Sequence, residues 1–236
     1  LSPEIIRAIE KRNIEVSTPV QAGCIPPMMD WQDVIAKAPT GTGKTCAFGI
    51  PVAEHIQPEN KYPQAVIMAP TRELAQQIAA ELTELVYFMP QVQVVCVYGG
   101  ANMDKQARQL AEGCQIVVAT PGRLMDHVKR RTVRLDKVET VVLDEADRML
   151  DMGFVHDVKK VIAKLPPRRQ NLMFSATMPA EIEQLAAGIL HDPAFVKVDP
   201  VSSTVDRIRQ SLYYVEKGNK KLLLPWLIQN LNDPPV

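Results

Sequence analysis

Cysteine is scarce in this 236-residue chain, and its cysteines form no close pair. Cys24, Cys46, Cys96 and Cys114 stand far apart in the sequence. The two-residue spacing that is typical of zinc and redox motifs is therefore missing. Three of the four lie in apolar stretches, where cysteine behaves as a small core residue. The pattern argues against a disulfide-stabilised scaffold or a zinc module, and it indicates a reducing compartment.

Long apolar runs and an excess of one charge are missing as well. No apolar run approaches the roughly 18 residues of a membrane-spanning helix, and no signal-peptide pattern opens the sequence. The 27 basic and 27 acidic residues cancel, so no global charge indicates a nucleic-acid partner. Such a partner would have to bind a local basic patch. We expect a cytoplasmic protein that does not contact a membrane.

The apolar residues, 46% of the chain, fall into short and nearly continuous runs. Such runs are typical of parallel strands that are covered on both faces. The candidate strands are residues 34–36, 65–69, 92–97, 115–119, 140–143, 171–174 and 195–198. Between them, apolar residues recur at helical spacing, as in residues 74–86 and 182–189. The pattern predicts a doubly wound α/β domain with a mostly parallel sheet and helices on both faces.

Two helices are expected before the first strand. Ser2 and Pro3 resemble an N-cap and a proline in the first turn, and Asn13 would end this helix. Pro19 would open the second helix and place Gln21 in its first turn. The Gln21 amide offers both a donor and an acceptor, as reading an adenine edge requires, although a lone glutamine is more often an ordinary surface residue.

A glycine-rich stretch between an expected strand and an expected helix ends in Gly43-Lys44-Thr45. The N-terminus of a helix offers unpaired N–H groups and the positive end of the helix dipole, and both attract phosphate. Lys44 could bind the outer phosphates and Thr45 could hold Mg²⁺. A flexible loop with a solvated lysine is the alternative. The candidate nucleotide-binding residues are Gln21, Pro39, Thr40, Gly41, Thr42, Gly43, Lys44 and Thr45.

An acidic tetrad, Asp144-Glu145-Ala146-Asp147, follows the expected strand that ends at Leu143. A carboxylate at a strand end could hold the Mg²⁺ whose other side meets Thr45. The next acid could orient or deprotonate the attacking water. The alternative is that Asp144 caps a helix with an acidic first turn. The glycine-rich stretch upstream favours the metal and water roles.

Further polar residues follow other strands, at the edge where parallel sheets collect ligands. They comprise Pro70, Thr71 and Arg72, then Thr120, Pro121, Gly122 and Arg123. Both groups are suited to start helices, yet each also brings a hydroxyl, helix-terminal N–H groups and an arginine that could grip a phosphodiester backbone. Gly99-Gly100 adds a turn that a backbone could approach closely. Ser175 and Thr177 could bond Asp147 or cap the helix expected at Pro179.

Together these stretches resemble the DEAD-box family of ATP-dependent RNA helicases, and they stand in the family's order across residues 1–200. The resemblance implies a RecA-like P-loop domain that uses ATP and Mg²⁺. Gln21 would recognise adenine, while Lys44 and Thr45 would hold phosphate and metal. Asp144 would hold the metal through water, and Glu145 would position the hydrolytic water. The implied catalytic residues are Lys44, Asp144 and Glu145.

The resemblance also implies roles outside the nucleotide site. Asp147, Ser175 and Thr177 would couple the nucleotide state to the grip on RNA. The implied RNA-binding residues are Pro70, Thr71, Arg72, Gly100, Thr120, Pro121, Gly122 and Arg123. Because the family binds RNA through sugar and phosphate, we expect no sequence preference, and a basic strip suffices on a neutral chain. Other RNA-processing proteins are further expected partners.

We expect residues 1–200 to form the ATP-binding domain and residues 201–236 to be a linker with the truncated start of a second RecA-like domain. In that tail, residues 208–215 would form a strand and residues 220–231 a helical segment interrupted by Pro225. The family's second domain carries arginines that complete the ATP site. Without it, we expect weak ATP binding and no useful turnover or unwinding.

Two other functions remain open. An ATP-gated RNA clamp would hold RNA without separating strands, and a strand-displacement assay on the full-length protein would distinguish it from a helicase. An unrelated P-loop ATPase or kinase is disfavoured, because such a protein does not need Arg72 and Arg123 at adjoining strand ends. The leading expectation is therefore an RNA helicase that remodels short duplexes.

Overall fold

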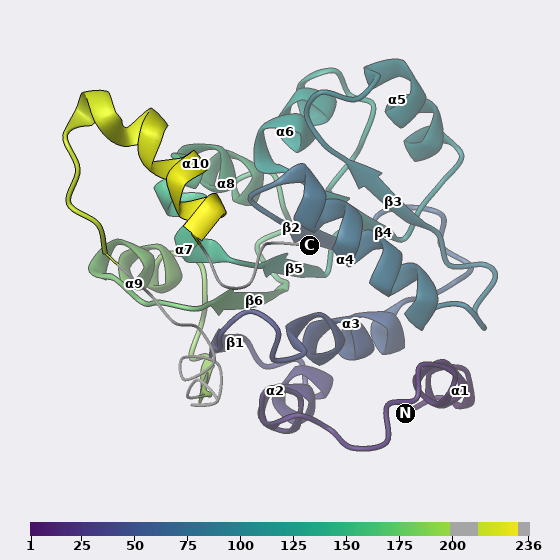
Figure 1. The fold of residues 1–236 in the computed structure, drawn as a ribbon. Coiled ribbons are helices and arrows are strands. Elements are labelled where there is room, and N and C mark those ends of the chain that lie inside the picture. The colour runs from purple at the N-terminus through teal and green to yellow at the C-terminus, as the bar shows by residue number, and fades with distance from the viewer. Residues whose placement is uncertain (199–211, 231–236) are drawn as a thin grey trace. The chain divides into compact units, whose positions relative to one another are not determined.

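A computed structural model describes residues 1–198 and 212–230 (Figure 1). The chain divides into two compact units, Leu1–Pro200 and Val201–Val236. The assignment of the second unit to a further RecA-like domain stays a prediction. None of the helices in the described ranges is both long and apolar enough to cross a membrane.

The first unit is built around one sheet of parallel strands. Its strands are β1 (Val34–Lys37), β2 (Ala65–Met68), β3 (Val94–Val97), β4 (Ile116–Ala119), β5 (Thr140–Leu143), β6 (Gln170–Ser175) and β7 (Ala194–Lys197). They lie side by side in the order β3-β4-β2-β5-β6-β1-β7, and each of these neighbouring pairs is parallel. The predicted strands are confirmed, with ends that shift by one or two residues. All strands run the same way, so their carboxyl ends meet at one edge.

Two helices precede the first strand, and the others connect successive strands. They are α1 (Pro3–Lys11), α2 (Pro19–Met29), α3 (Lys44–His55), α4 (Arg72–Leu85), α5 (Met103–Ala111), α6 (Pro121–Lys129), α7 (Ala146–Asp151), α8 (Val155–Ile162) and α9 (Ala180–Ala187). The expected helix starts are confirmed at Ser2, whose hydroxyl accepts from the Ile5 N–H, and at Pro19. Asn13 follows α1 with φ of 53°, a left-handed conformation that asparagine tolerates well.

Two hydrophobic clusters fill the space between the sheet and its helices. One cluster joins the sheet to α1, α2, α3 and α4, and the other joins it to α5, α6, α7, α8 and α9. Successive side chains of each strand alternate between them: in β2, Ile67 enters the first, whereas Val66 and Met68 enter the second. Burial on both faces explains why β2 and β4 are apolar throughout.

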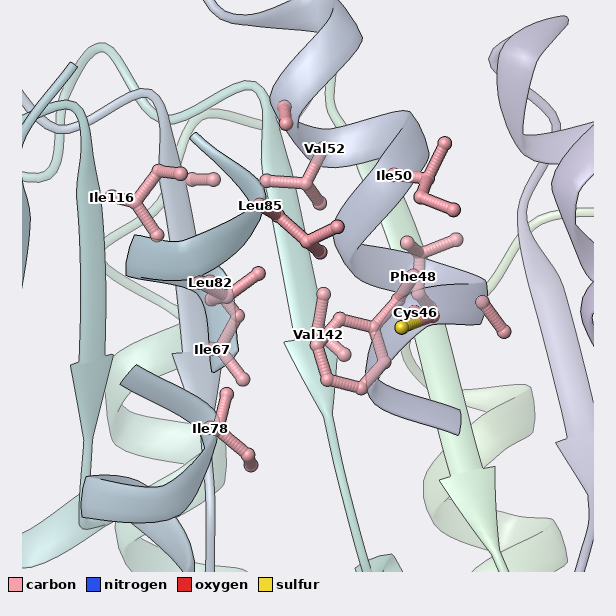
Figure 2. Packing of buried hydrophobic residues seen from close by; sticks show 14 of the residues in the cluster. Cys46, Phe48, Ile50, Val52, Ile67, Ile78, Leu82, Leu85, Ile116 and Val142 are labelled. Atoms are coloured by element: carbon pink, nitrogen blue, oxygen red, sulfur yellow. The ribbon is translucent and has the colours of Figure 1, made fainter. Parts of the chain in front are cut away.

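The first cluster holds α3 and α4 closely against the sheet (Figure 2). Phe48 of α3 is fully buried, and its ring meets Phe174 of β6 edge to face with centroids 5.2 Å apart. A Cβ on Gly49 would lie 2.8 Å from methyl groups of both Leu82 and Leu85, so only glycine permits this approach of the two helices. The packing fixes α3, and hence the loop that precedes it.

The second unit is described only in part. It contains η2 (Lys217–Asn219) and α10 (Lys220–Asn230). Residues 208–211 of the expected strand lie outside the described residues, and residues 212–215 form no strand, so that prediction is not supported where it can be compared. The expected interruption at Pro225 is wrong, because the proline lies within α10. A proline removes one helical hydrogen bond, and a helix can continue past that loss.

Candidate functional site

The glycine-rich loop joins β1 to α3 and ends in two left-handed glycines. Gly41 has φ of 83°, and Gly43 caps α3 with φ of 90°. Both values favour glycine, because a Cβ would clash with the backbone. Gly43 is also crowded, since a Cβ there would lie 2.6 Å from Gln21 Nε2. The loop can therefore approach a ligand with its backbone alone.

Gln21 supports this loop from α2. Its Oε1 accepts from the Thr18 N–H at 3.0 Å, and its Nε2 donates to the Gly43 carbonyl at 3.1 Å. The side chain is 5% exposed. Both ends of the amide thus hold protein backbone in this structure, so Gln21 positions the glycine loop. Its predicted recognition of adenine stays a prediction.

Lys44 and Asp144 face each other beneath the loop. Lys44 begins α3, Asp144 follows β5, and Lys44 Nζ lies 3.6 Å from Asp144 Oδ1. Both residues are buried. Burial raises the pKa of Asp144, and the nearby Lys44 ammonium opposes that shift. The sequence expectation that these distant residues share one cleft is confirmed.

The Lys44 ammonium lacks a hydrogen-bond acceptor among the described residues. Within the described chain, Lys44 Nζ is a buried nitrogen without a hydrogen-bond partner, and Asp144 lies beyond hydrogen-bond distance. A buried cation in this state is costly. An anionic phosphate oxygen would supply the missing acceptor, so the site fits a nucleotide.

Glu145 occupies a strained position at the end of β5. It caps α7 with φ of 51° and ψ of 52°, which a residue with a Cβ adopts only at a cost. Its Oε1 accepts from the Thr40 hydroxyl at 3.2 Å, and its Oε2 pairs with Arg148 Nη1 at 3.2 Å. The backbone conformation therefore turns this carboxylate toward the glycine loop.

A cavity of about 260 Å³ lies between these residues. It is lined by Thr40, Gly41, Gly43, Lys44, Thr45, Leu74, Gln77, Glu81, Asp144 and Glu145. The α4 side chains were not expected here, because they read as an ordinary amphipathic helix. Gln77 Nε2 donates to Glu81 Oε1 at 3.0 Å, and Arg12 Nη2 lies 3.6 Å from Glu81 Oε2. The positive charge of Arg12 thus offsets the negative charge of Glu81 on this side of the cavity.

The oxygen atoms available to a metal are few. No cluster of three or more His, Cys, Asp or Glu residues suited to a metal occurs in residues 1–198 and 212–230. Asp144 and Thr45 both line the cavity, and each carries side-chain oxygen. Mg²⁺ usually takes one or two protein oxygens and completes its shell with phosphate and water. The residues present fit a magnesium nucleotide and not a metal held by protein alone.

Asp147 links the ends of β5 and β6. Thr177 donates to Asp147 Oδ2 from both its N–H and its hydroxyl, each at 2.8 Å. The Ser175 hydroxyl accepts from the Asp147 N–H at 3.1 Å. Burial raises the pKa of Asp147, but the hydrogen bonds from Thr177 and Ser175 outweigh it and leave the pKa below its usual value. The expected contact of these three residues is present.

The candidate RNA-binding residues follow the carboxyl ends of β2, β3 and β4, in the other half of the sheet. Pro70, Thr71 and Arg72 follow β2, and the Thr71 hydroxyl caps α4 by accepting from the Leu74 N–H at 3.2 Å. The Arg72 side chain is 63% exposed and pairs with Glu73. A Cβ built on Gly100, which has φ of 86°, would lie 3.9 Å from Arg72 Nη1. These residues therefore share one surface.

The second helix start on that surface follows β4. Thr120 caps α6 without a side-chain hydrogen bond, Pro121 occupies its first position, and Gly122 is half-buried. Arg123 is half-buried as well, and its Nη1 donates to the Ala101 carbonyl at 2.9 Å. The predicted RNA contacts of these residues are untested, but the structure brings all of them to one edge.

The strand order explains how the two sets are separated. The ends of β5, β6 and β1 are consecutive in the sheet and carry Asp144, Ser175 and the glycine loop. The ends of β3, β4 and β2 are likewise consecutive and carry Gly100, Thr120 and Arg72. The two groups adjoin at the β2–β5 pairing. A nucleotide and an extended polymer could occupy the same edge side by side.

Comparison with known proteins assigns the family. Residues 18–185 match the model of the DEAD/DEAH box helicase family. The chain is 46% identical to a DEAD-box ATP-dependent RNA helicase CshA of Geobacillus kaustophilus, over 94% of this chain and 47% of that protein. It is 43% identical to an RNA helicase CrhR of Synechocystis, over 99% of this chain and 47% of that protein. The chain thus spans about half the length of these relatives.

A solved structure agrees with this assignment. The crystal structure of a DEAD box protein from Methanococcus jannaschii superposes with a TM-score of 0.78 at 37% identity, covering 98% of this chain and 62% of that one. The parallel sheet therefore matches a RecA-like α/β domain, as the sequence predicts. From the fold, the site and these comparisons together, the chain belongs to the DEAD/DEAH box helicase family.

Proposed function

We propose that this chain is the ATP-binding half of an ATP-dependent RNA helicase, which couples ATP hydrolysis to RNA binding and local separation of duplexes. The observation that carries the proposal is the buried Lys44 ammonium. It has no hydrogen-bond partner among the described residues, and it faces Asp144 under a left-handed glycine loop. Membership of the helicase family supports the activity and disfavours an unrelated kinase.

Each residue of the cleft has a defined task in this proposal. Lys44 binds a phosphate oxygen, and the N–H groups at the start of α3 surround the phosphates. Thr45 and Asp144 hold Mg²⁺, which when bound would offset the negative charge of the phosphates. Glu145 orients the attacking water, for which its fixed backbone is suited. Gln21 keeps the glycine loop in place through the Gly43 carbonyl.

RNA would lie across the ends of β2, β3 and β4. Arg72 is exposed there, and the helix starts at Thr71 and Thr120 offer N–H groups to phosphate. These groups contact sugar and phosphate, so the grip would not depend on base sequence. Asp147 with Thr177 would connect the nucleotide cleft to this grip. A cytoplasmic location and other RNA-processing partners are part of the same proposal.

The test uses the full-length protein, because the matched relatives are about twice as long as this chain. Glu145→Gln should bind ATP as the wild type does but lose RNA-stimulated turnover, and Lys44→Ala should lose ATP binding. Glu183→Gln on α9, an exposed acid away from the cleft, is the matched control and should behave as the wild type. Turnover that survives Glu145→Gln would refute the role of Glu145.

Strand displacement decides between the two RNA functions. A helicase should separate a short duplex in the presence of ATP and Mg²⁺. An ATP-gated clamp should bind RNA tightly with ATP and leave the duplex intact. A protein that binds no RNA in either nucleotide state would contradict both.

A further inference from the structure

The Gly99-Gly100 turn is held at both ends by side chains. It connects β3 to α5, both glycines are exposed, and Gly100 has φ of 86°. Gln106 Nε2 donates to the Tyr98 carbonyl at 3.2 Å, on one side of the turn. Arg123 Nη1 donates to the Ala101 carbonyl at 2.9 Å, on the other side.

The two side chains that hold the turn also contact each other. Arg123 Nη1 donates to Gln106 Oε1 at 2.9 Å, so one guanidinium nitrogen serves both acceptors. Gln106 belongs to α5 and is 4% exposed, whereas Arg123 belongs to α6. Because its Oε1 meets a donor and its Nε2 meets a carbonyl, the orientation of the Gln106 amide is determined.

His127 completes the cluster from the next turn of α6. The ring is fully buried, and its Nε2 lies 3.2 Å from Gln106 Oε1. That oxygen only accepts, so Nε2 must carry a proton. Nδ1 lies 2.7 Å from the Thr132 hydroxyl, which can donate to it when the ring is neutral. Burial and the nearby Arg123 guanidinium lower the pKa of His127, so the neutral form prevails near pH 7.

The cluster lies beneath the surface proposed to bind RNA. Gln106 and His127 are buried and cannot touch a ligand, while the exposed turn lies beside Arg72. Neither side chain takes part in the nucleotide cleft, whose lining comes from other elements. A buried amide with both ends engaged is costly to disturb, because each lost partner leaves a polar atom unsatisfied.

We propose that Gln106 and His127 are positioning residues for RNA binding. Gln106 holds the Gly99-Gly100 turn through the Tyr98 carbonyl and through Arg123, and His127 fixes the Gln106 amide. Arg123 accordingly acts through the turn as well as through any direct contact of its own. This inference rests on the proposed RNA function. It assigns a role to two buried polar residues that the sequence analysis did not single out.

The expected result is a loss of RNA affinity with an unchanged dependence on salt. Gln106→Ala removes the hydrogen bonds to the Tyr98 carbonyl and from Arg123. It should weaken binding of single-stranded RNA about tenfold, which corresponds to one to two hydrogen bonds. Because Gln106 is uncharged, a plot of log RNA affinity against log salt concentration should shift to lower affinity and keep its slope. Removing a phosphate contact instead lowers that slope by about 0.7 for single strands, as we expect for Arg72→Ala.

Two matched variants sharpen the measurement. Gln109→Ala alters the same residue type on the same helix at an exposed position, and it should bind RNA as the wild type does. Gln106→Glu keeps an acceptor for Arg123 but has no N–H for the Tyr98 carbonyl, so it should also bind weakly. ATP affinity is measured for every variant and should not change, because the cleft is separate.

The double variant Gln106→Ala with Arg123→Ala tests whether both residues affect RNA affinity by holding the same turn. If both residues act through one turn, the combined loss should fall short of the product of the single losses. Full multiplicative losses, or wild-type RNA affinity for Gln106→Ala, would overturn the inference. If Gln106→Ala also loses ATP affinity, His127→Asn is judged by the same criteria. A wild-type protein that binds ATP but no RNA would refute the proposed function itself.

Discussion

The comparison of Gly41→Ala with Gly43→Ala separates two effects in the glycine loop. Both glycines are left-handed, with φ of 83° and 90°, so an alanine costs about 1–2 kcal/mol at either position. A Cβ at position 41 meets nothing within 4 Å. A Cβ at position 43 would lie 2.6 Å from Gln21 Nε2 and 3.2 Å from Thr18 Oγ1.

The extra cost at Gly43 follows from what holds Gln21. A free side chain would move aside cheaply, but this one is 5% exposed and is tied to the Gly43 carbonyl and the Thr18 N–H. Losing those two hydrogen bonds costs about 1–3 kcal/mol, at roughly 0.5–1.5 kcal/mol each. Gly43→Ala should therefore lower the free energy of unfolding by about 2–5 kcal/mol in total, since strain and lost bonds add.

The measurement is urea denaturation without nucleotide, so that ligand binding does not alter the result. We expect Gly43→Ala to be less stable than Gly41→Ala by about 1–3 kcal/mol. Adding Gln21→Ala to Gly43→Ala should cost less than Gln21→Ala costs in the wild type, because the clash has already broken the Gln21 hydrogen bonds and removing the side chain relieves it. Equal stability of the two glycine variants would refute the argument that Gln21 is fixed.

Three further changes test the core and the polar contacts. Phe48→Ala should cost about 3–5 kcal/mol in thermal or chemical unfolding, because the ring is fully buried; a smaller loss would mean that the cluster collapses around it. Asp33→Asn should cost about 2–3 kcal/mol, since the Asp33 carboxylate accepts from the Asn171 N–H, the Asn171 amide and the His191 N–H; an unchanged stability would contradict this. Asp147 has a lowered pKa, so its charged form stabilises the fold above its ordinary value of 3.8 and loses that effect as the pH falls through the folded value. Asp147→Asn should therefore have a lower free energy of unfolding than the wild type at neutral pH. This difference, measured by urea denaturation, should disappear as the pH falls below the folded-state pKa of Asp147.

The elements and the nucleotide motif were predictable because their signals are local. Continuous apolar runs predict buried strands, and the glycine loop needs only its neighbours to form a helix start. The proximity of Lys44 and Asp144 followed from a rule about strand ends. The order of the strands did not follow, because pairing depends on contacts between distant residues.

Buried polar residues account for much of what the sequence could not predict. Gln106 lies on a helix with many polar residues, and only the docking of α5 against the turn and α6 reveals that it is buried. Gln21 was interpreted through its amide chemistry, yet both ends of that amide hold backbone. Pro225 was expected to interrupt a helix that in fact continues. For Gln106 the tertiary contacts overrode a local rule, and for Pro225 the tolerance of a helix for one missing hydrogen bond did so. The adenine contact of Gln21 stays a prediction.

One backbone hydrogen bond joins the two halves of the ligand edge. The Asp144 N–H donates to the Met68 carbonyl at 3.0 Å, where β5 pairs with β2. Two residues beyond Met68 the chain enters the segment that carries Thr71 and Arg72. The peptide group of Asp144 is thus bonded to the strand end that leads into the Arg72 segment, so a displacement of one is opposed by the other. A movement of the residues after β5 must therefore either shift the Thr71 and Arg72 segment as well or first break this hydrogen bond.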